Sequence, residues 1–189
     1  MKYMRKKLLT STIIMVMIIL STACNRMDDR YEKGDKGAPV PDELHPVVEE
    51  NKNMLVEQAA DSDIEVVITD GIRSVDEQNE LYAEGRSAEG DIVTNAKGGE
   101  SYHNYGLAID FALRDADGEI IWDTEYDGND NGQADWFEVA GIAKDLGFEW
   151  GGEWESSPDY PHLQMDFGLS IDQLQNGWRP KDDAAATAE

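Results

Sequence analysis

The sequence has little of several things that would otherwise place it in a class. It contains one cysteine, Cys24, among 189 residues, so no disulfide can form within the chain. Its 16 Lys and Arg residues stand against 40 Asp and Glu residues, and the net charge of −24 argues against nucleic acid or anionic lipid as a partner. Its one long apolar run, from Leu8 to Leu20, is too short to be a convincing membrane span. Histidine is also scarce, with three residues: His45, His103 and His162.

The first 23 residues are predicted to be the export signal of a lipoprotein. Four basic residues precede the apolar run, and no acidic residue occurs before Cys24. The run closes on Leu20-Ser21-Thr22-Ala23-Cys24, which resembles a bacterial lipobox; in such proteins cleavage precedes the cysteine, whose thiol then carries diacylglycerol. The alternative is an ordinary signal peptide with an incidental cysteine. We therefore expect an extracytoplasmic protein that is anchored to the membrane through lipid on Cys24.

The rest of the chain is long enough for one domain with a sizeable core. Residues 24–40 are polar and lack apolar periodicity, which predicts a linker between the anchor and the domain. Residues 41–180 are predicted to form the domain, and 181–189 a disordered tail. We expect a monomer.

Apolar periodicity in the domain predicts an α+β fold. Apolar positions of helical spacing predict helices at about 46–59, 75–83, 136–146 and 172–176. Runs rich in β-branched residues, or with alternating polarity, predict strands at 64–68, 107–113, 120–122 and 162–167. The region 85–100 lacks periodicity and is predicted to be a long loop, and long loops in compact domains often carry function.

Arg73 is predicted to lie at a junction between a strand and a helix. Ser74 and Glu77 have the spacing of a capping box, so a helix should begin directly after Arg73 and fix its position. Such junctions often line clefts. The alternative is that Arg73 is simply a surface cation.

The segment from Ser101 to Asp110, taken with Asp159-Tyr160-Pro161-His162, has the composition of a catalytic metal site. Catalytic zinc typically has three protein ligands and keeps one position open, and His103, Asp110 and His162 would supply the three. Asp159 is predicted to lie within reach of the water at the open position, as a general base. His45 has no such neighbours and is interpreted as a surface or capping residue.

These motifs are similar to a known family. Ser-x-His-x-x-Gly-x-Ala-x-Asp followed by Asp-x-Pro-His-x-Gln resembles the zinc peptidases of the lysostaphin, D-alanyl-D-alanine peptidase and hedgehog superfamily, particularly the peptidoglycan L-alanyl-D-glutamate endopeptidase branch. The resemblance extends from about Thr69 to Gln164 and includes Gly71-Ile72-Arg73-Ser74, Gln78, Thr94 to Gly99 and Trp150-Gly151-Gly152. Ile72 stands where the family usually has tyrosine, and this difference affects packing more than chemistry.

The resemblance implies a small antiparallel sheet flanked by helices, with the zinc site in a cleft on the sheet. It implies that zinc activates a water, that Asp159 takes its proton, that Arg73 stabilises the oxyanion, and that Ser101, Gln78 and Gln164 contact the substrate. The implied substrate is the peptidoglycan stem peptide, cut between L-alanine and D-glutamate. Two alternatives stay open: a D,D- or L,D-carboxypeptidase, and an inactive zinc-bearing module that binds the cell wall.

A second metal pattern lies between residues 127 and 138. Oxygen-bearing side chains occupy the first, third, fifth, ninth and twelfth positions, and Gly132 the sixth, as in an EF-hand calcium loop. No helix is predicted before it, and Asn-Gly and Asp-Gly steps also occur in plain turns. A structural calcium ion and a plain turn therefore remain alternatives. The candidate ligands are Asp127, Asn129, Asn131, Gln133, Asp135 and Glu138.

Overall fold

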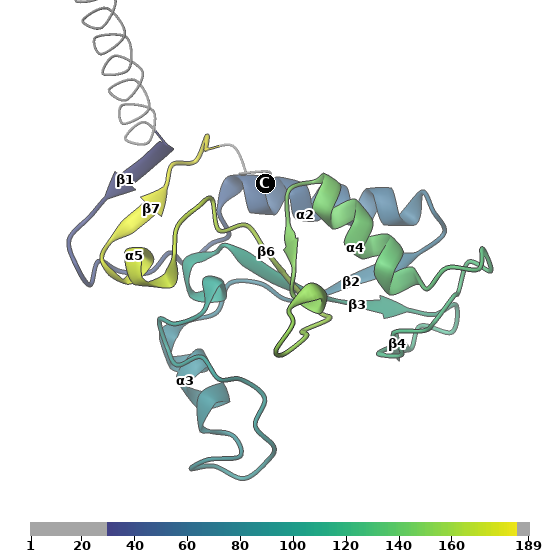
Figure 1. Cartoon of the computed structure of the whole chain (residues 1–189), viewed down its shortest axis with the longest axis horizontal. Helices are drawn as coiled ribbons and strands as arrows, with labels where there is room; N and C mark the ends of the chain where they lie inside the picture. Colours follow the sequence, from purple (N-terminus) through teal and green to yellow (C-terminus); the bar gives the residue numbers. More distant parts are fainter. Residues whose placement is uncertain (1–29, 185–189) are drawn as a thin grey trace, which may run out of the picture.

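The computed structural model describes residues 30–184 (Figure 1). The predicted export signal and Cys24 lie outside these residues. Within residues 30–184 no helix is long and apolar enough to cross a membrane.

The centre of the fold is an antiparallel sheet, as predicted. Its strands run in the order β2-β3-β6-β5, and β4 pairs with the far end of β3. β3 is central, and its apolar residues Ile109, Phe111 and Leu113 are fully buried. The strands are β2 (Glu65–Asp70), β3 (Ala108–Arg114), β4 (Ile120–Ile121), β5 (Glu149–Trp150) and β6 (His162–Gln164). β5 was not predicted, because two residues carry no periodic signal.

Two helices cover one side of this sheet (Figure 1). α2 (Pro46–Ala60) packs on β2, and α4 (Asp135–Asp145) packs on α2 and β5. Both were predicted within a residue or two, and the core between them and the sheet contains the buried side chains Val48, Leu55, Ala59, Trp136, Val139 and Ala143. His45 caps α2: its Nδ1 accepts from the backbone N–H of Val47. The predicted capping role is confirmed, although the ring is buried.

α3 (Val75–Ala83) begins at the predicted residue and extends away from the sheet together with the 85–100 loop (Figure 1). The capping box is present in full: Ser74 Oγ accepts from the Glu77 N–H, and Glu77 Oε2 accepts from the Ser74 N–H at 2.8 Å. This cap fixes the residue that precedes it, Arg73.

Removal of this cap is expected to weaken the domain measurably. Ser74→Ala should lower the free energy of unfolding by about 0.5–2 kcal/mol, because the Glu77 N–H loses its acceptor. Urea unfolding measures the change, with Ser87→Ala as the matched control on the exposed loop. Equal midpoints for the two variants would show that the cap contributes nothing.

The predicted linker and tail are wrong where the structure describes them. β1 (Tyr31–Lys33) pairs with β7 (Trp178–Pro180), and the Tyr31 hydroxyl donates to the Phe167 carbonyl at 2.6 Å. Lys181 N–H donates to the Arg30 carbonyl, and Ala184 is buried. Three-residue strands are too short to show periodicity in sequence, and only their pairing makes them ordered. The domain therefore includes residues 30–40 and 181–184.

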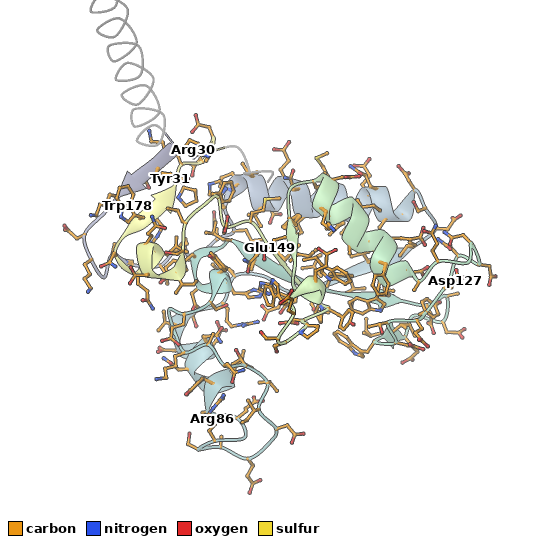
Figure 2. The ribbon with its side chains drawn as sticks, in the orientation of Figure 1. Arg30, Tyr31, Arg86, Asp127, Glu149 and Trp178 are labelled. Carbon is orange, nitrogen blue, oxygen red and sulfur yellow. The ribbon has the colours of Figure 1, made fainter. Side chains whose placement is uncertain are left out.

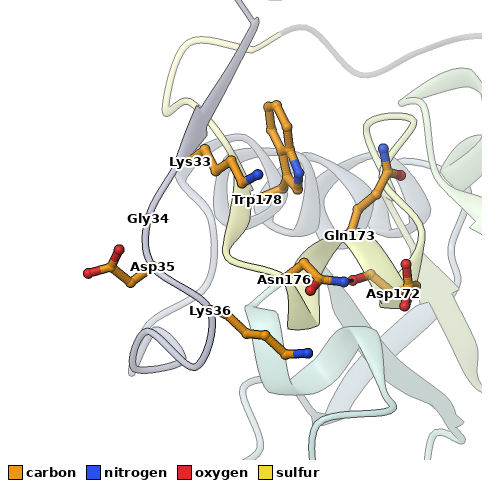
Figure 3. A pocket seen from close by; sticks show the side chains of 8 residues that line it. All are labelled: Lys33, Gly34, Asp35, Lys36, Asp172, Gln173, Asn176 and Trp178. Carbon is orange, nitrogen blue, oxygen red and sulfur yellow. Dashed lines mark hydrogen bonds between the residues drawn. The ribbon is translucent and has the colours of Figure 1, made fainter.

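The β1–β7 pair borders an open hollow of about 440 Å³ (Figure 3). Short helix α5 (Ile171–Gln175), close to the predicted 172–176, contributes Asp172 and Gln173 to its lining. Lys33 Nζ lies 5.0 Å from the centre of the Trp178 ring, a cation–π contact that joins the two strands. None of the predicted zinc ligands lines this hollow.

Candidate metal centre

Strand pairing brings two of the predicted zinc ligands together. Asp110 on β3 is directly opposite His162 on β6, and Asp70 on β2 is opposite Asp110 on the other side. Residues paired across an antiparallel sheet project from the same face, so the three side chains form one row. A register irregularity between Ile68 and Asp70 places Asp70 in this row. The sequence predicted Asp110 and His162, but not Asp70.

The third predicted ligand, His103, comes from a short 3-10 helix, η1 (Tyr102–Tyr105), just before β3. Ser101 begins it: its Oγ accepts from the His103 N–H. Gly106 ends it in the left-handed region, with φ +67, and a Cβ there would lie 2.5 Å from the Glu43 carbonyl oxygen. The tight turn at Gly106 lets His103 face the sheet, as the sequence predicted.

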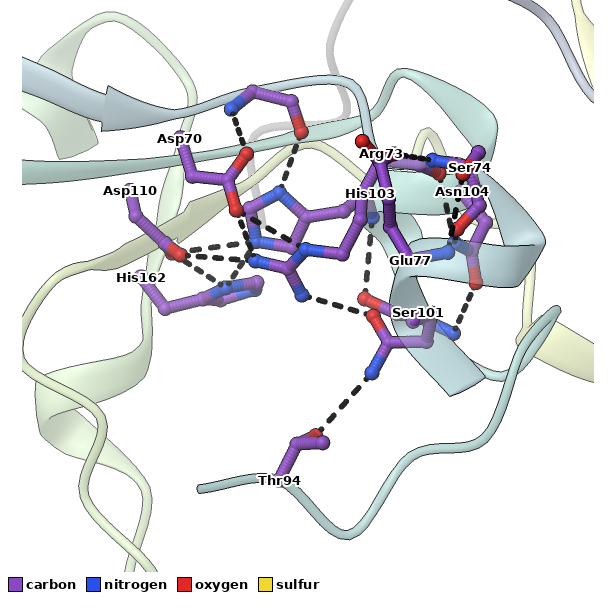
Figure 4. Close-up of polar contacts among 12 residues, drawn as sticks. Asp70, Arg73, Ser74, Glu77, Thr94, Ser101, His103, Asn104, Asp110 and His162 are labelled. Atoms are coloured by element: carbon purple, nitrogen blue, oxygen red, sulfur yellow. Dashed lines mark hydrogen bonds and ion pairs between the residues drawn. The ribbon is translucent and has the colours of Figure 1, made fainter. Parts of the chain in front are cut away.

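The three ligand atoms form a nearly equilateral triangle (Figure 4). His103 Nε2 is 3.2 Å from Asp110 Oδ1 and 3.2 Å from His162 Nδ1, and His162 Nδ1 is 3.3 Å from Asp110 Oδ1. Ligands held about 2.0–2.1 Å from a tetrahedral zinc are themselves about 3.3 Å apart. The residues therefore fit zinc, with two imidazoles and one carboxylate on one side of the ion.

Each imidazole has a partner that fixes which nitrogen carries the proton. His103 Nδ1 lies 2.7 Å from the Gly71 carbonyl oxygen, which can only accept, so Nε2 is left with its lone pair. His162 Nε2 lies 2.9 Å from Gln164 Oε1, so the lone pair falls on Nδ1. Such outer partners orient metal-binding histidines. Both rings thus present a lone pair to the same point.

Asp110 is held as a carboxylate. Burial alone would raise its pKa, but the neighbouring His103 and His162 side chains lower the pKa well below the ordinary value. Arg73 Nη2 also lies 3.4 Å from Asp110 Oδ2, the oxygen that faces away from the two imidazoles. The charged form that a metal requires is therefore the stable one here.

Arg73 is fixed beside these ligands, as the capping pattern predicted (Figure 4). Its Nε donates to Asp70 Oδ2 at 3.1 Å, and Nη1 donates to Gln78 Oε1 at 2.8 Å. Gln78 is fully buried, and its Nε2 donates to the Ala96 carbonyl and to Thr94 Oγ1. Gln78 therefore connects Arg73 to the 85–100 loop; its predicted contact with substrate stays a prediction.

Asn104 joins the two halves of the site and was not predicted from the sequence. Its Oδ1 accepts from the Gly99 N–H at 2.8 Å, and its Nδ2 donates to the Arg73 carbonyl at 2.9 Å. The Arg73 N–H in turn donates to the His103 carbonyl. Because Asn104 is fully buried, these bonds hold the start of α3 against η1.

Asp159 lies on the loop between η2 (Gly151–Glu153) and β6, and its side chain is exposed to solvent. Its backbone N–H donates to the Gly151 carbonyl, and a Cβ on Gly151 would meet the Asp159 carbonyl at 2.7 Å, so glycine permits this close approach. Neighbouring protein displaces water and raises the pKa of Asp159, while His162 opposes that shift and Asp110 adds to it. The pKa of this carboxylate therefore depends on the charges of these two predicted metal ligands.

A relay behind His162 was not predicted. Gln164 Nε2 donates to Glu149 Oε2 at 2.9 Å, which turns Oε1 of the same amide toward His162. Glu149 Oε1 accepts from the Trp154 indole N–H, and the Trp154 ring lies 5.2 Å from the His162 ring. Glu149 and Gln164 are cross-strand partners on β5 and β6. Glu149, central in Figure 2, thus fixes the amide that fixes His162.

Loss of the Glu149 carboxylate is expected to weaken zinc binding. Glu149→Gln would let the Gln164 amide turn over, so that its NH₂ faces His162 Nε2 and disfavours the metal-binding tautomer. Outer partners of this kind are worth about 10–100-fold in affinity. Competition with a chromophoric chelator measures the change, and Glu153→Gln is the matched control, an exposed glutamate that pairs with Lys144. Equal affinities for the two variants would contradict the relay.

The structure also places the remaining predicted site residues, which are Ser101, Gln164 and the six candidate calcium ligands. Ser101 caps η1, and both ends of the Gln164 amide have protein partners, so the predicted substrate contacts of these two side chains stay predictions. Four of the six candidate calcium ligands lie in a separate loop before α4, and Asp135 and Glu138 lie in the first turn of α4. None of them belongs to the His–Asp–His group.

Two strands of an antiparallel sheet and the short helix η1 together hold two histidines and an aspartate in zinc geometry, with an exposed aspartate nearby. This is the site of a metal-dependent hydrolase. Comparison with known proteins narrows the class. Residues 94–165 match a family model described as D-alanyl-D-alanine carboxypeptidase. The chain is 64% identical over 127 residues to the peptidoglycan L-alanyl-D-glutamate endopeptidase CwlK of Bacillus subtilis, covering 67% of this chain and 76% of that protein.

Two further relatives are more distant. An L-alanyl-D-glutamate peptidase of a Listeria phage is 32% identical over 124 residues, which is 65% of this chain and 38% of the phage protein. The crystal structure of the Serratia marcescens L-Ala D-Glu endopeptidase ChiX is 24% identical, covers 70% of this chain and 84% of that one, and gives a TM-score of 0.46. On the Bacillus match, the chain belongs to the zinc peptidase family that contains the peptidoglycan L-alanyl-D-glutamate endopeptidases and D-alanyl-D-alanine carboxypeptidases.

Proposed function

We propose that this protein hydrolyses peptidoglycan stem peptides between L-alanine and D-glutamate, with zinc held by His103, Asp110 and His162. The observation that carries the proposal is the 64% identity to an endopeptidase of that specificity over 127 residues. The triangle of ligand atoms supports the metal, because its edges fit a tetrahedral zinc ion.

The residues around the triangle have distinct tasks. When bound, zinc lowers the pKa of water to about 7 and polarises a carbonyl group. Asp159 takes the proton of the attacking water and returns it to the leaving amine, which its exposed position and raised pKa favour. Arg73, oriented by Asp70 and Gln78, donates to the oxyanion that develops on the scissile carbonyl.

Specific features distinguish the proposed endopeptidase from its two alternatives, a carboxypeptidase and an inactive wall-binding module. The matched family model is described as a carboxypeptidase, which keeps D,D- or L,D-carboxypeptidase activity as the second candidate. Carboxypeptidases of the superfamily generally carry Glu and Trp before the last histidine, whereas this chain has Asp159-Tyr160-Pro161-His162. An inactive module that binds the wall would have no use for a solvent-exposed carboxylate beside the metal ligands.

The predicted location is also a proposal. Residues 1–23 are proposed to direct export, and Cys24 to carry the lipid that holds the protein at the membrane, facing the wall. Five residues separate Cys24 from Arg30, the first residue that the structure describes. In any conformation five residues span less than about 20 Å. The domain would then act close to the membrane surface, a shorter reach than a 17-residue linker would allow. Metabolic labelling with a fatty acid, lost in Cys24→Ala, tests the anchor.

Digestion of defined muropeptides tests the reaction. The full chain is incubated with stem peptides, and the products are identified by mass spectrometry. Fragments split between L-alanine and D-glutamate are the expected result. Loss of a terminal D-alanine alone would establish the carboxypeptidase instead, and intact peptides in the presence of bound zinc would favour the binding module.

A further inference from the structure

The loop of residues 127–138, which we call the acidic loop, folds around a single carboxylate. It begins at Asp127 at the end of the molecule beside α4 (Figure 2). Asp127 Oδ1 and Oδ2 accept from the N–H groups of Asn131 and Gly132 at 3.1 and 2.9 Å. Glu138, from the first turn of α4, points back into the loop and accepts from Asn129 Nδ2 at 3.3 Å and Asn131 Nδ2 at 2.8 Å. Side chains from both ends of the loop thus hydrogen-bond to groups in its middle.

Asp135 provides independent evidence for a bound ligand, because one of its carboxylate oxygens is buried without a partner. Its side chain is 2% exposed, and its Oδ2 accepts from the Gly128 N–H at 3.1 Å, so the carboxylate lies inside the loop. Its Oδ1 is buried and has no hydrogen-bond partner. A buried carboxylate oxygen without a partner is costly, and such groups call for an ion or water.

The charge around Asp135 makes the cost larger. Burial raises the pKa of Asp135, and the nearby carboxylates of Glu138 and Asp127 raise it further. Among residues 30–184, no Lys or Arg forms an ion pair with Asp127, Asp130, Asp135 or Glu138. Arg114 lines the same hollow as Asp135 but is paired with Glu65, so the four acidic groups of this loop have no ion-pair partner in the described part of the chain. A bound cation would remove both the repulsion and the unpaired oxygen.

We propose that the acidic loop binds one Ca²⁺ ion. Its ligands are the side-chain oxygens of Asp127, Asn129, Asn131, Asp135 and Glu138, with the backbone carbonyl of Gln133. Glu138 exchanges its two amide N–H partners for the cation. The donors are all oxygens and have the spacing of a twelve-residue calcium loop, which favours Ca²⁺ over zinc. Asparagine at two positions reduces the ligand charge, so we expect affinity of about 10⁻⁴–10⁻³ M, as in extracellular modules.

The ion would stabilise the start of α4, the helix that packs on β5. α4 begins at Asp135 without a side-chain cap, so the calcium ligands Asp135 and Glu138 would fix its first turn. Phe137, in the same turn, packs edge-on against Trp150 at 5.4 Å, and the Trp150 indole N–H donates to the carbonyl of Tyr160, the neighbour of Asp159. Calcium is therefore a structural ion whose loss loosens the segment that carries Asp159.

Terbium luminescence on the zinc-loaded full chain tests this site without reference to activity. Tb³⁺ is a Ca²⁺ substitute that Trp136, next to Asp135, can sensitise. We expect saturable emission at one Tb³⁺ per chain, displaced by Ca²⁺ and poorly by Mg²⁺, and a melting temperature that rises with added Ca²⁺. Absence of calcium-displaceable emission in the wild type, together with an unchanged melting temperature, would overturn the proposal.

Charge-matched variants locate the ion. Asp127→Asn removes a first-position ligand, whereas Asp130→Asn makes the same charge change at the fourth position, whose side chain is not a ligand. We expect Asp127→Asn and Glu138→Gln to weaken Ca²⁺ binding at least tenfold, and Asp130→Asn to change it less than threefold. Equal weakening in Asp127→Asn and Asp130→Asn would mean diffuse attraction to acidic residues and would contradict a built site.

Discussion

Asp159→Asn is expected to lower the rate of stem-peptide hydrolysis at least about 100-fold while leaving zinc content unchanged. General bases contribute about 10²–10⁴-fold, and asparagine keeps the shape of the side chain but cannot take a proton. Asp159 is exposed and is not one of the three ligands, so the His–Asp–His triangle should bind zinc as before. Initial rates on a defined muropeptide and zinc analysis of the same sample measure both quantities.

A neighbouring carboxylate supplies the control for this prediction. Glu155→Gln makes the same charge change on the same loop at an exposed residue, and its rate should remain within about twofold of the wild type, as expected for an exposed surface substitution. If Asp159→Asn kept a tenth or more of the wild-type rate, Asp159 would not be the base. If it lost zinc, the residue would act through the metal instead.

Asp110→Asn is expected to abolish both zinc retention and activity. Asp110 is the one anionic ligand of the triangle, and it contacts His103, His162 and Arg73 at once. Its pKa is held well below the ordinary value by the two histidines, so the folded protein carries the charge that zinc requires. Ligand binding stabilises a fold by about 2.7 kcal/mol at 100 times Kd, and this zinc-dependent gain should vanish in the variant.

Thermal unfolding with and without zinc measures this effect. The wild-type melting temperature should rise with zinc, and that of Asp110→Asn should not. Asp117→Asn, on the exposed turn after β3, is the matched control and should keep the full zinc response. A zinc response in Asp110→Asn as large as that in the control would remove Asp110 from the ligand set.

The sequence predicted the parts of this protein whose cause is local. The capping box at Ser74 and Glu77 predicted the start of α3 to the residue, and the spacing of His103, Gly106 and Asp110 predicted that two ligands would converge. Local signals of this kind need only a few neighbouring residues, so they can be recognised before the fold is known.

What the sequence did not predict depends on pairing between distant strands. Asp70 and Glu149 enter the site because they lie opposite Asp110 and Gln164, and strand register is not visible in one sequence. β1 was likewise predicted as part of a linker, since the three residues Tyr31–Lys33 are too few to show a pattern of their own. The role of Glu149 depends on its contact with Gln164, which the sequence alone does not reveal.

Zinc titration of the metal-free full chain, followed by the rate of muropeptide cleavage, tests the central claim most directly. The geometry of His103, Asp110 and His162 predicts that activity rises in proportion to added zinc and stops rising at one ion per chain. Full cleavage by the metal-free chain in the presence of a chelator would contradict it.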